Sequence, residues 1–107
     1  MRHFNLKDII PAKNKRGVPS RTVVDRADAT IKELLLEAGE SIPPHEMPMD
    51  VTFFVLEGEG TITIGEHAYP VKPLDIVLCP PGTSMAVKAG AKKKLYFLNI
   101  KTPGLNA

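Results

Sequence analysis

Prolines and glycines interrupt this sequence so often that long helices are disfavoured. Ten prolines and eight glycines are spread over 107 residues. Proline lacks the amide proton that a helix interior or a central strand requires, and glycine permits the positive φ angles of tight turns. The chain therefore favours many short elements joined by turns, and its length suits one domain with a single core.

From residue 51 onward, short apolar segments alternate with turn residues. The segments VTFFVLE, TITI, AYPV, IVLC, SMAVK and KLYFLNI are rich in β-branched, aromatic and aliphatic residues, and sequences such as GEH, KPLD and PPGT separate them. Regularly spaced strands of this kind predict an all-β sandwich or barrel.

Residues 27–40, ADATIKELLLEAGE, fit two structures. Four apolar side chains recur at helical spacing, and Gly39 could cap the end of a helix. The segment TIKELLLE also fits a strand that continues a hairpin from RTVVD, and every other segment favours a strand. Because consistency among segments favours one fold class, we predict a strand here.

Charge and cysteine content indicate which partners and which cellular compartment to expect. The 14 Lys and Arg residues exceed the 12 Asp and Glu residues by only two, and they are spread along the chain, so we expect no nucleic-acid partner. Cys79 is alone, no signal-peptide pattern opens the chain, and no apolar stretch approaches the roughly 20 residues that cross a bilayer. We therefore expect a soluble cytoplasmic protein without a membrane partner.

Two motifs in this sequence resemble those of the cupin family, which are small β-barrels of the jelly-roll type. The first family motif reads G, five residues, H-x-H, three or four residues, E, six residues, G, and here Gly39, His45 and Gly58 keep this frame. The second reads G, five residues, P-x-G, two residues, H, three residues, N, and here residues 80–82 match as PPG. The resemblance covers roughly residues 30–102 and implies a cupin double-stranded β-helix.

We predict an N-terminal arm at residues 1–19 and a barrel domain at residues 20–107. The arm contains two prolines and the basic segment KNKRG, and we expect it to wrap the outside of the barrel or to reach a neighbouring molecule. Small cupins commonly form homodimers by exchanging N-terminal strands, and exposed edge strands invite pairing. We therefore expect a homodimer.

In cupins, three histidines and one glutamate hold a divalent metal inside the barrel. Carried over by position, these four ligands fall on His45, Met47, Val51 and Met85. Only one of them has a nitrogen or oxygen donor, and a lone imidazole does not hold Mn, Fe, Ni or Zn against water. We therefore predict no metal cofactor of the usual kind.

The alternation of side chains along strands predicts a pocket around these positions. If His45 points inward, so does Met47, while Val51 and Phe53 line the same face of the next strand and Met85 points inward from a later one. Methionine fills irregular apolar space once a metal is lost. We therefore predict an apolar pocket, lined by these five residues, that binds a small polar, carboxylate-bearing or sugar-derived molecule.

Two alternatives remain open. His45, Met47 and Met85 could form a soft Cu(I) site, because thioethers and imidazole suit that ion. The protein could instead be a metal-free enzyme similar to the cupin sugar epimerases, with His45 as general base on a carbon next to a carbonyl. The base would need an acidic or orienting partner, for which the candidates by residue type are Asp50, Glu57, Glu59 and Tyr69.

Overall fold

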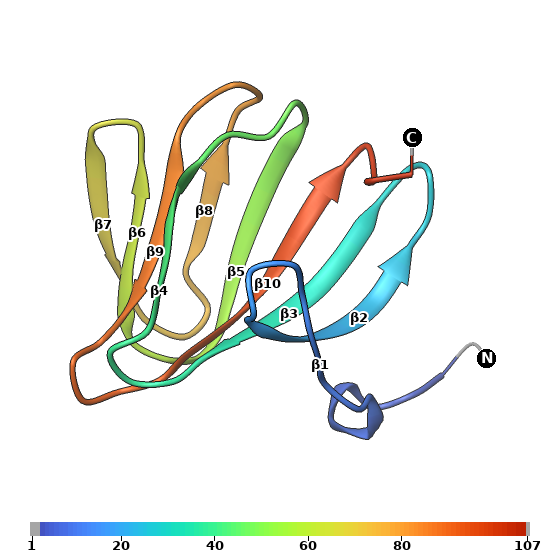
Figure 1. The fold of residues 1–107 in the computed structure, drawn as a ribbon, viewed down its shortest axis with the longest axis horizontal. Coiled ribbons are helices and arrows are strands. Elements are labelled where there is room, and N and C mark those ends of the chain that lie inside the picture. The colour runs from blue at the N-terminus through green and yellow to red at the C-terminus, as the bar shows by residue number, and fades with distance from the viewer. Residues whose placement is uncertain (1–2, 107) are drawn as a thin grey trace.

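The protein is almost entirely built from β-strands, as the ribbon shows (Figure 1). The computed structural model describes residues 3–106, which contain one short 3-10 helix, η1, at Leu6–Asp8. The strands are β1 (Ala12–Lys13), β2 (Pro19–Asp25), β3 (Thr30–Leu36), β4 (Ser41–His45), β5 (Asp50–Gly58), β6 (Gly60–Ile64), β7 (His67–Val71), β8 (Ile76–Cys79), β9 (Met85–Ala89) and β10 (Leu95–Thr102). The predicted all-β fold is confirmed.

The ambiguous segment at residues 27–40 is a strand rather than a helix. Its residues 30–36 form β3, which pairs with β2 on one side and with β10 on the other. The hydrogen bonds supplied by two neighbouring strands outweigh the weak helical pattern of the isolated segment. Within residues 3–106, no helix has the length and apolar character needed to cross a bilayer.

Two antiparallel sheets face each other and enclose the core. One sheet has the strand order β1-β2-β3-β10-β5-β8, and the other has the order β4-β9-β6-β7. Alternate side chains of β5, namely Val51, Phe53 and Val55, are almost completely buried and meet Ile62 of β6 in the same core cluster. The two-residue period of the strands thus brings the apolar faces of both sheets together.

Strand β4 has an irregular course that matters for the site. It is the edge strand of its sheet and contains Pro43 and Pro44, whose missing amide protons are tolerated at an edge. Its pairing with β9 shifts register between Ile42 and His45, and His45 then lies opposite Met85. An irregularity of this kind reorients the side chains that follow it.

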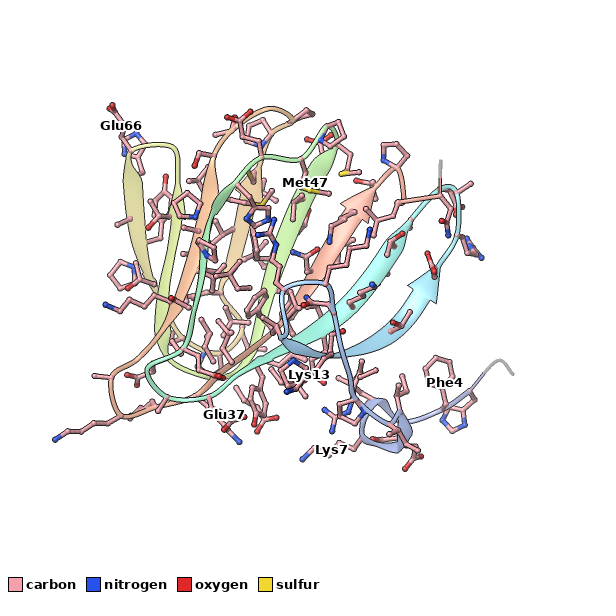
Figure 2. The ribbon with its side chains drawn as sticks, in the orientation of Figure 1. Phe4, Lys7, Lys13, Glu37, Met47 and Glu66 are labelled. Carbon is pink, nitrogen blue, oxygen red and sulfur yellow. The ribbon has the colours of Figure 1, made fainter. Side chains whose placement is uncertain are left out.

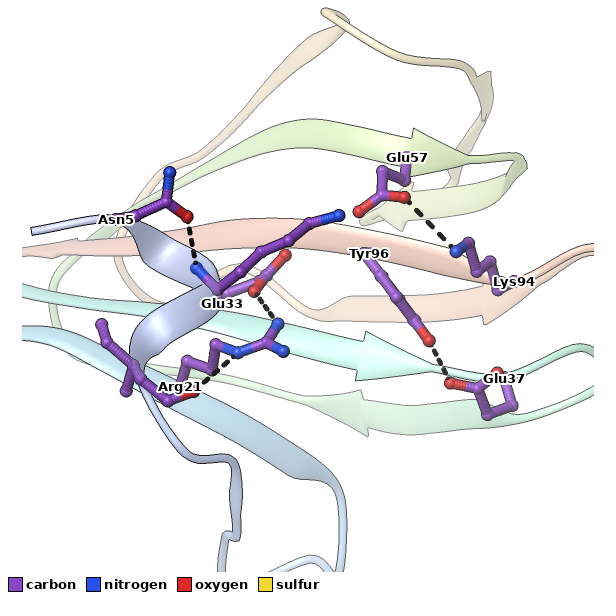
Figure 3. Close-up of polar contacts among 9 residues, drawn as sticks. Asn5, Arg21, Glu33, Glu37, Glu57, Lys94 and Tyr96 are labelled. Carbon is purple, nitrogen blue, oxygen red and sulfur yellow. Dashed lines mark hydrogen bonds and ion pairs between the residues drawn. The ribbon is translucent and has the colours of Figure 1, made fainter.

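The N-terminal arm folds back onto its own barrel. Its β1 pairs with β2, and the carbonyl oxygen of Ile9 accepts a hydrogen bond of 2.9 Å from Arg21 Nε. The same guanidinium forms a 2.7 Å ion pair with Glu33, which is 2% exposed on the outer face of β3 (Figure 3). The arm therefore covers part of the outer face of the larger sheet, and β2 begins at the last residue of the predicted arm.

Candidate functional site

A cavity of about 490 Å³ opens between the two sheets and has an apolar floor. Phe53, Val87 and Phe97 form the most buried part of the lining, each no more than 2% exposed. Lys13, on the arm, and Met47, between β4 and β5, also border the cavity (Figure 2). Its volume falls within the range of small-molecule pockets, roughly 300–1,000 Å³.

The polar side chains around this cavity are predominantly basic. Lys32 and Lys101 form part of the wall and are half-buried, whereas Lys13, Lys15 and Arg16 lie at the exposed rim. Within residues 3–106, no Asp or Glu side chain lines the cavity. A chain with a net charge of only +2 thus gathers uncompensated positive charge at one opening, which favours an anionic ligand.

A compact turn in the arm holds the basic rim in place. The side-chain oxygen of Asn14 accepts hydrogen bonds from the backbone amides of Arg16, at 2.9 Å, and Val18, at 3.0 Å. Gly17 closes the turn with a φ of +78°, a conformation that glycine adopts without strain. Asparagine side chains stabilise turns in this way, and here the turn brings Lys15 and Arg16 to the mouth of the cavity.

The wall of the cavity is set by the register of three strands in the larger sheet. Asn99 of β10 lies opposite Lys32 of β3 and opposite Phe53 of β5. Lys101, two residues further on, projects to the same face and is a diagonal neighbour of Lys32. On the inward face of β10, the buried apolar residues Leu95 and Phe97 are therefore followed by the polar residues Asn99 and Lys101.

Lys101 of this wall has a lowered pKa. Burial first, and then repulsion by the charge of Lys32, lowers its pKa from 10.5 to about 8. Its Nζ donates a hydrogen bond to Asn99 Oδ1. Asn99 is 6% exposed, so this neutral amide satisfies the amine inside the barrel without supplying a negative charge.

His45 lies at the cavity wall and has a defined ring orientation. Its Nδ1 is 3.1 Å from the carbonyl oxygen of Pro43. Because a carbonyl oxygen only accepts hydrogen bonds, this contact requires the proton on Nδ1 and leaves Nε2 of the neutral ring unprotonated. The imidazole can therefore accept a proton or a hydrogen bond at Nε2.

The structure brings together three of the five residues predicted to line a ligand pocket. His45, Met47 and Phe53 line the cavity. Val51 and Met85, each 1% exposed, belong to the hydrophobic core and lie outside this lining. Three of the five side chains therefore lie at the cavity wall, and the other two lie deeper, in the core between the sheets.

The residues at the four cupin ligand positions do not fit a divalent metal ion. His45 supplies one imidazole, while Met47, Val51 and Met85 supply no nitrogen or oxygen donor. Nor does any group of three or more His, Cys, Asp or Glu side chains within the described residues have an arrangement suited to a metal ion.

The four partner candidates for His45 all lie away from the cavity. Near the end of β5 and the start of β10, Glu57 forms an ion pair with Lys94, and Glu59 forms one with Lys93. Tyr69 is 45% exposed and stacks on His67, and Asp50 is exposed. The charged groups that share the cavity with His45 are lysines and an arginine instead.

Sequence reasoning missed Lys32, Asn99 and Lys101. A signal for them was present, because Lys32 shares strand parity with Leu34 and Leu36, and Asn99 shares parity with Phe97. Polar residues on an otherwise apolar strand face are more informative than the apolar residues around them. The sequence around Lys13, Lys15 and Arg16 shows no such pattern. These residues reach the rim only because the arm folds back and β1 pairs with β2.

The double sheet, the two motifs and the central cavity define a small barrel of the jelly-roll class. The chain belongs to the cupin family, because the family model described as "Cupin domain" matches residues 32–101. This result confirms the family and the double-stranded β-helix fold predicted from the motifs.

Solved structures of similar proteins agree with this fold. A predicted oxalate decarboxylase from Thermotoga maritima superposes with a TM-score of 0.85 at 20% identity, covering 94% of this chain and 98% of that one. The polyketide cyclase RemF from Streptomyces resistomycificus superposes with a TM-score of 0.84 at 18% identity, covering 95% of this chain and 79% of that one. At these identities, the likeness shows the fold alone.

A curated relative is similar over part of the chain. The 5-nitrosalicylic acid 1,2-dioxygenase from Bradyrhizobium sp is 31% identical over 65 residues, which make up 60% of this chain. The matched part spans 31% of the length of that dioxygenase. The names of these proteins, a dioxygenase, a cyclase and a predicted decarboxylase, describe those proteins.

Proposed function

We propose that this protein binds a small organic carboxylate, including sugar-derived acids, inside the barrel without a divalent metal. The observation that carries the proposal is the cavity of about 490 Å³ in which five basic side chains and no acidic one surround an apolar floor. The carboxylate pairs with Lys32 and the basic rim, and the carbon skeleton packs on Phe53 and Phe97. Charge-assisted hydrogen bonds to carboxylates are stronger than neutral ones, so charge gives the selectivity.

Calorimetric titration of the full chain tests this proposal. The probes are glucuronate, citrate and 2-oxoglutarate, with glucose as the uncharged counterpart of glucuronate. We expect at least one carboxylate to bind and glucose not to bind. Replacing Lys32 by Gln weakens carboxylate binding by about tenfold, because a hydrogen bond to a charged group contributes about 1.5 kcal/mol or more.

Lys88→Gln is the matched control, because Lys88 is an exposed lysine of β9 outside the cavity lining. This variant binds carboxylates with unchanged affinity. Equal binding of glucose and glucuronate, an unaltered affinity in Lys32→Gln, or no binding by any of the three carboxylates at millimolar concentration would each refute the proposal.

A second candidate function is supported by the orientation of the His45 ring. The contact between Nδ1 and the Pro43 carbonyl leaves Nε2 unprotonated at the cavity wall, which suits a general base in a metal-free epimerase or isomerase. Such a base removes a proton from a carbon next to a carbonyl. Proton NMR in D₂O detects this step as loss of the C–H signal of a bound carbonyl compound. An exchange rate that is the same in wild type and His45→Gln removes His45 from this role.

A further inference from the structure

Within residues 3–106, the amine of Lys101 differs from the other paired lysines in having no acidic partner. Lys72, Lys93 and Lys94 each form an ion pair with a nearby carboxylate on the surface. Lys101 instead lies half-buried in the cavity wall, where its hydrogen-bond partner is the neutral Asn99. No carboxylate among the described residues that line the cavity holds this amine in its charged form.

The surroundings of Lys101 increase the fraction of free amine. Burial and the charge of Lys32 bring its pKa to about 8, against 10.5 for an ordinary lysine. At neutral pH this raises the population of the neutral form by a factor on the order of 10². Lysines that are desolvated or lie next to another cation are nucleophilic for this reason.

Lys32 and Lys101 also offer complementary sites to one small molecule. Both side chains point to the inward face of the larger sheet, Lys32 from β3 and Lys101 from the neighbouring β10. Lys101 lies two residues beyond Asn99, which pairs with Lys32, so the two lysines are diagonal neighbours. Diagonal side chains in an antiparallel sheet have Cβ atoms about 7 Å apart. A carboxylate held by Lys32 can therefore place an adjacent carbonyl carbon within reach of the Lys101 amine.

We propose that Lys101 forms an imine with a 2-oxo acid bound in this cavity. The inference rests on the carboxylate binding proposed above and adds both the reacting residue and the substrate class. The lone pair of Nζ forms a bond to the carbonyl carbon, and the carbonyl π electrons move to oxygen. Two proton transfers from nitrogen to that oxygen then release it as water and leave the C=N bond. Carbon and nitrogen keep their overall oxidation level, so no oxidant or reductant takes part in this step.

Reductive trapping of the full chain tests the proposal. The protein is incubated with pyruvate and sodium cyanoborohydride, which reduces imines to stable secondary amines, and the modified residue is located by peptide mass mapping. We expect a single adduct on Lys101, and none with lactate, which has the same carboxylate but no carbonyl. The initial rate of trapping at Lys101 rises with pH and levels off with a midpoint of about 8.

Two variants distinguish the reaction from simple binding. Lys101→Arg keeps a positive charge but removes the nucleophile, so it loses the adduct. Lys88→Arg changes an exposed lysine outside the cavity lining and keeps the full adduct yield on Lys101. Lactate binding without a pyruvate adduct, or adducts spread over exposed lysines but absent from Lys101, overturns the imine and leaves the proposed function standing. Absence of both binding and adduct overturns both proposals.

Discussion

Replacing Lys101 by Met should stabilise the folded protein at neutral pH. Lys101 loses its proton more readily in the folded state than in the unfolded chain, so its charged form, which predominates at neutral pH, weakens folding. The fall of its pKa from 10.5 to about 8 corresponds to about 3 kcal/mol at most, at about 1.4 kcal/mol for each pH unit. Methionine fills similar space without carrying charge, so Lys101→Met gains up to this amount in free energy of unfolding.

The gain should disappear as the pH rises. Above about pH 8 the folded protein releases the proton of Lys101, whereas the unfolded chain keeps it until about pH 10.5. The unfolded state therefore binds more protons in this window, and the stability contributed by this position rises with pH. The difference between Lys101→Met and wild type is largest near neutral pH, shrinks from about pH 8 and vanishes above about pH 10.5.

Urea unfolding followed by far-ultraviolet circular dichroism measures this difference at a series of pH values. Lys88→Met is the control, because Lys88 is exposed, and its stability should stay within about 0.5 kcal/mol of wild type at every pH. A Lys101→Met variant that is less stable than wild type at neutral pH would contradict a destabilising charge at this position, as would a difference that does not change with pH. A confirmed gain would mean that the protein retains a destabilising amine in its cavity, as functional sites commonly do.

Three further predictions concern the backbone and the methionines. Gly58→Ala should cost about 3 kcal/mol in urea unfolding, because a Cβ at φ +86° would lie 1.7 Å from the Lys94 carbonyl oxygen; a loss below about 1 kcal/mol contradicts this. Leu74→Gly should stabilise the protein by about 0.5–1 kcal/mol, since Leu74 has a φ of +77° and is 75% exposed, and a loss of stability would contradict the strain. Against a Cu(I) chelator, wild type should retain no more copper than a Met47→Leu, Met85→Leu variant, because Met85 is packed in the core; greater retention by wild type would support the copper site.

The strands of this fold were predictable because their signals are local. Alternating apolar side chains in segments such as VTFFVLE, and turn residues such as PPGT, act over a few residues regardless of the rest of the chain. The segment that became β3 needed one further step, because its own pattern fits a helix as well. Its two neighbours in the sheet decided the outcome.

The site was predictable only in part. Motif spacing and strand parity located His45, Met47 and Phe53 on the inward face, and all three line the cavity. The same parity does not tell how deeply each side chain is packed, so it does not separate Val51 and Met85, which belong to the core, from the residues that line the cavity. How deeply a side chain is buried depends on the packing between the two sheets, and the sequence of a single strand does not determine that packing.

Residue identity and spacing along single strands were enough to predict the fold and the family, and they show which side chains stand at the four cupin ligand positions. The charge of the cavity, in contrast, follows from how the strands and the arm pack together. Lys32 and Lys101 become neighbours through the register of β3 with β10, and Lys15 and Arg16 reach the rim because the arm folds back on its own barrel. The electrostatic attraction of a ligand depends on how close the charges lie in space. Here the charges that lie close together come from residues far apart in the chain.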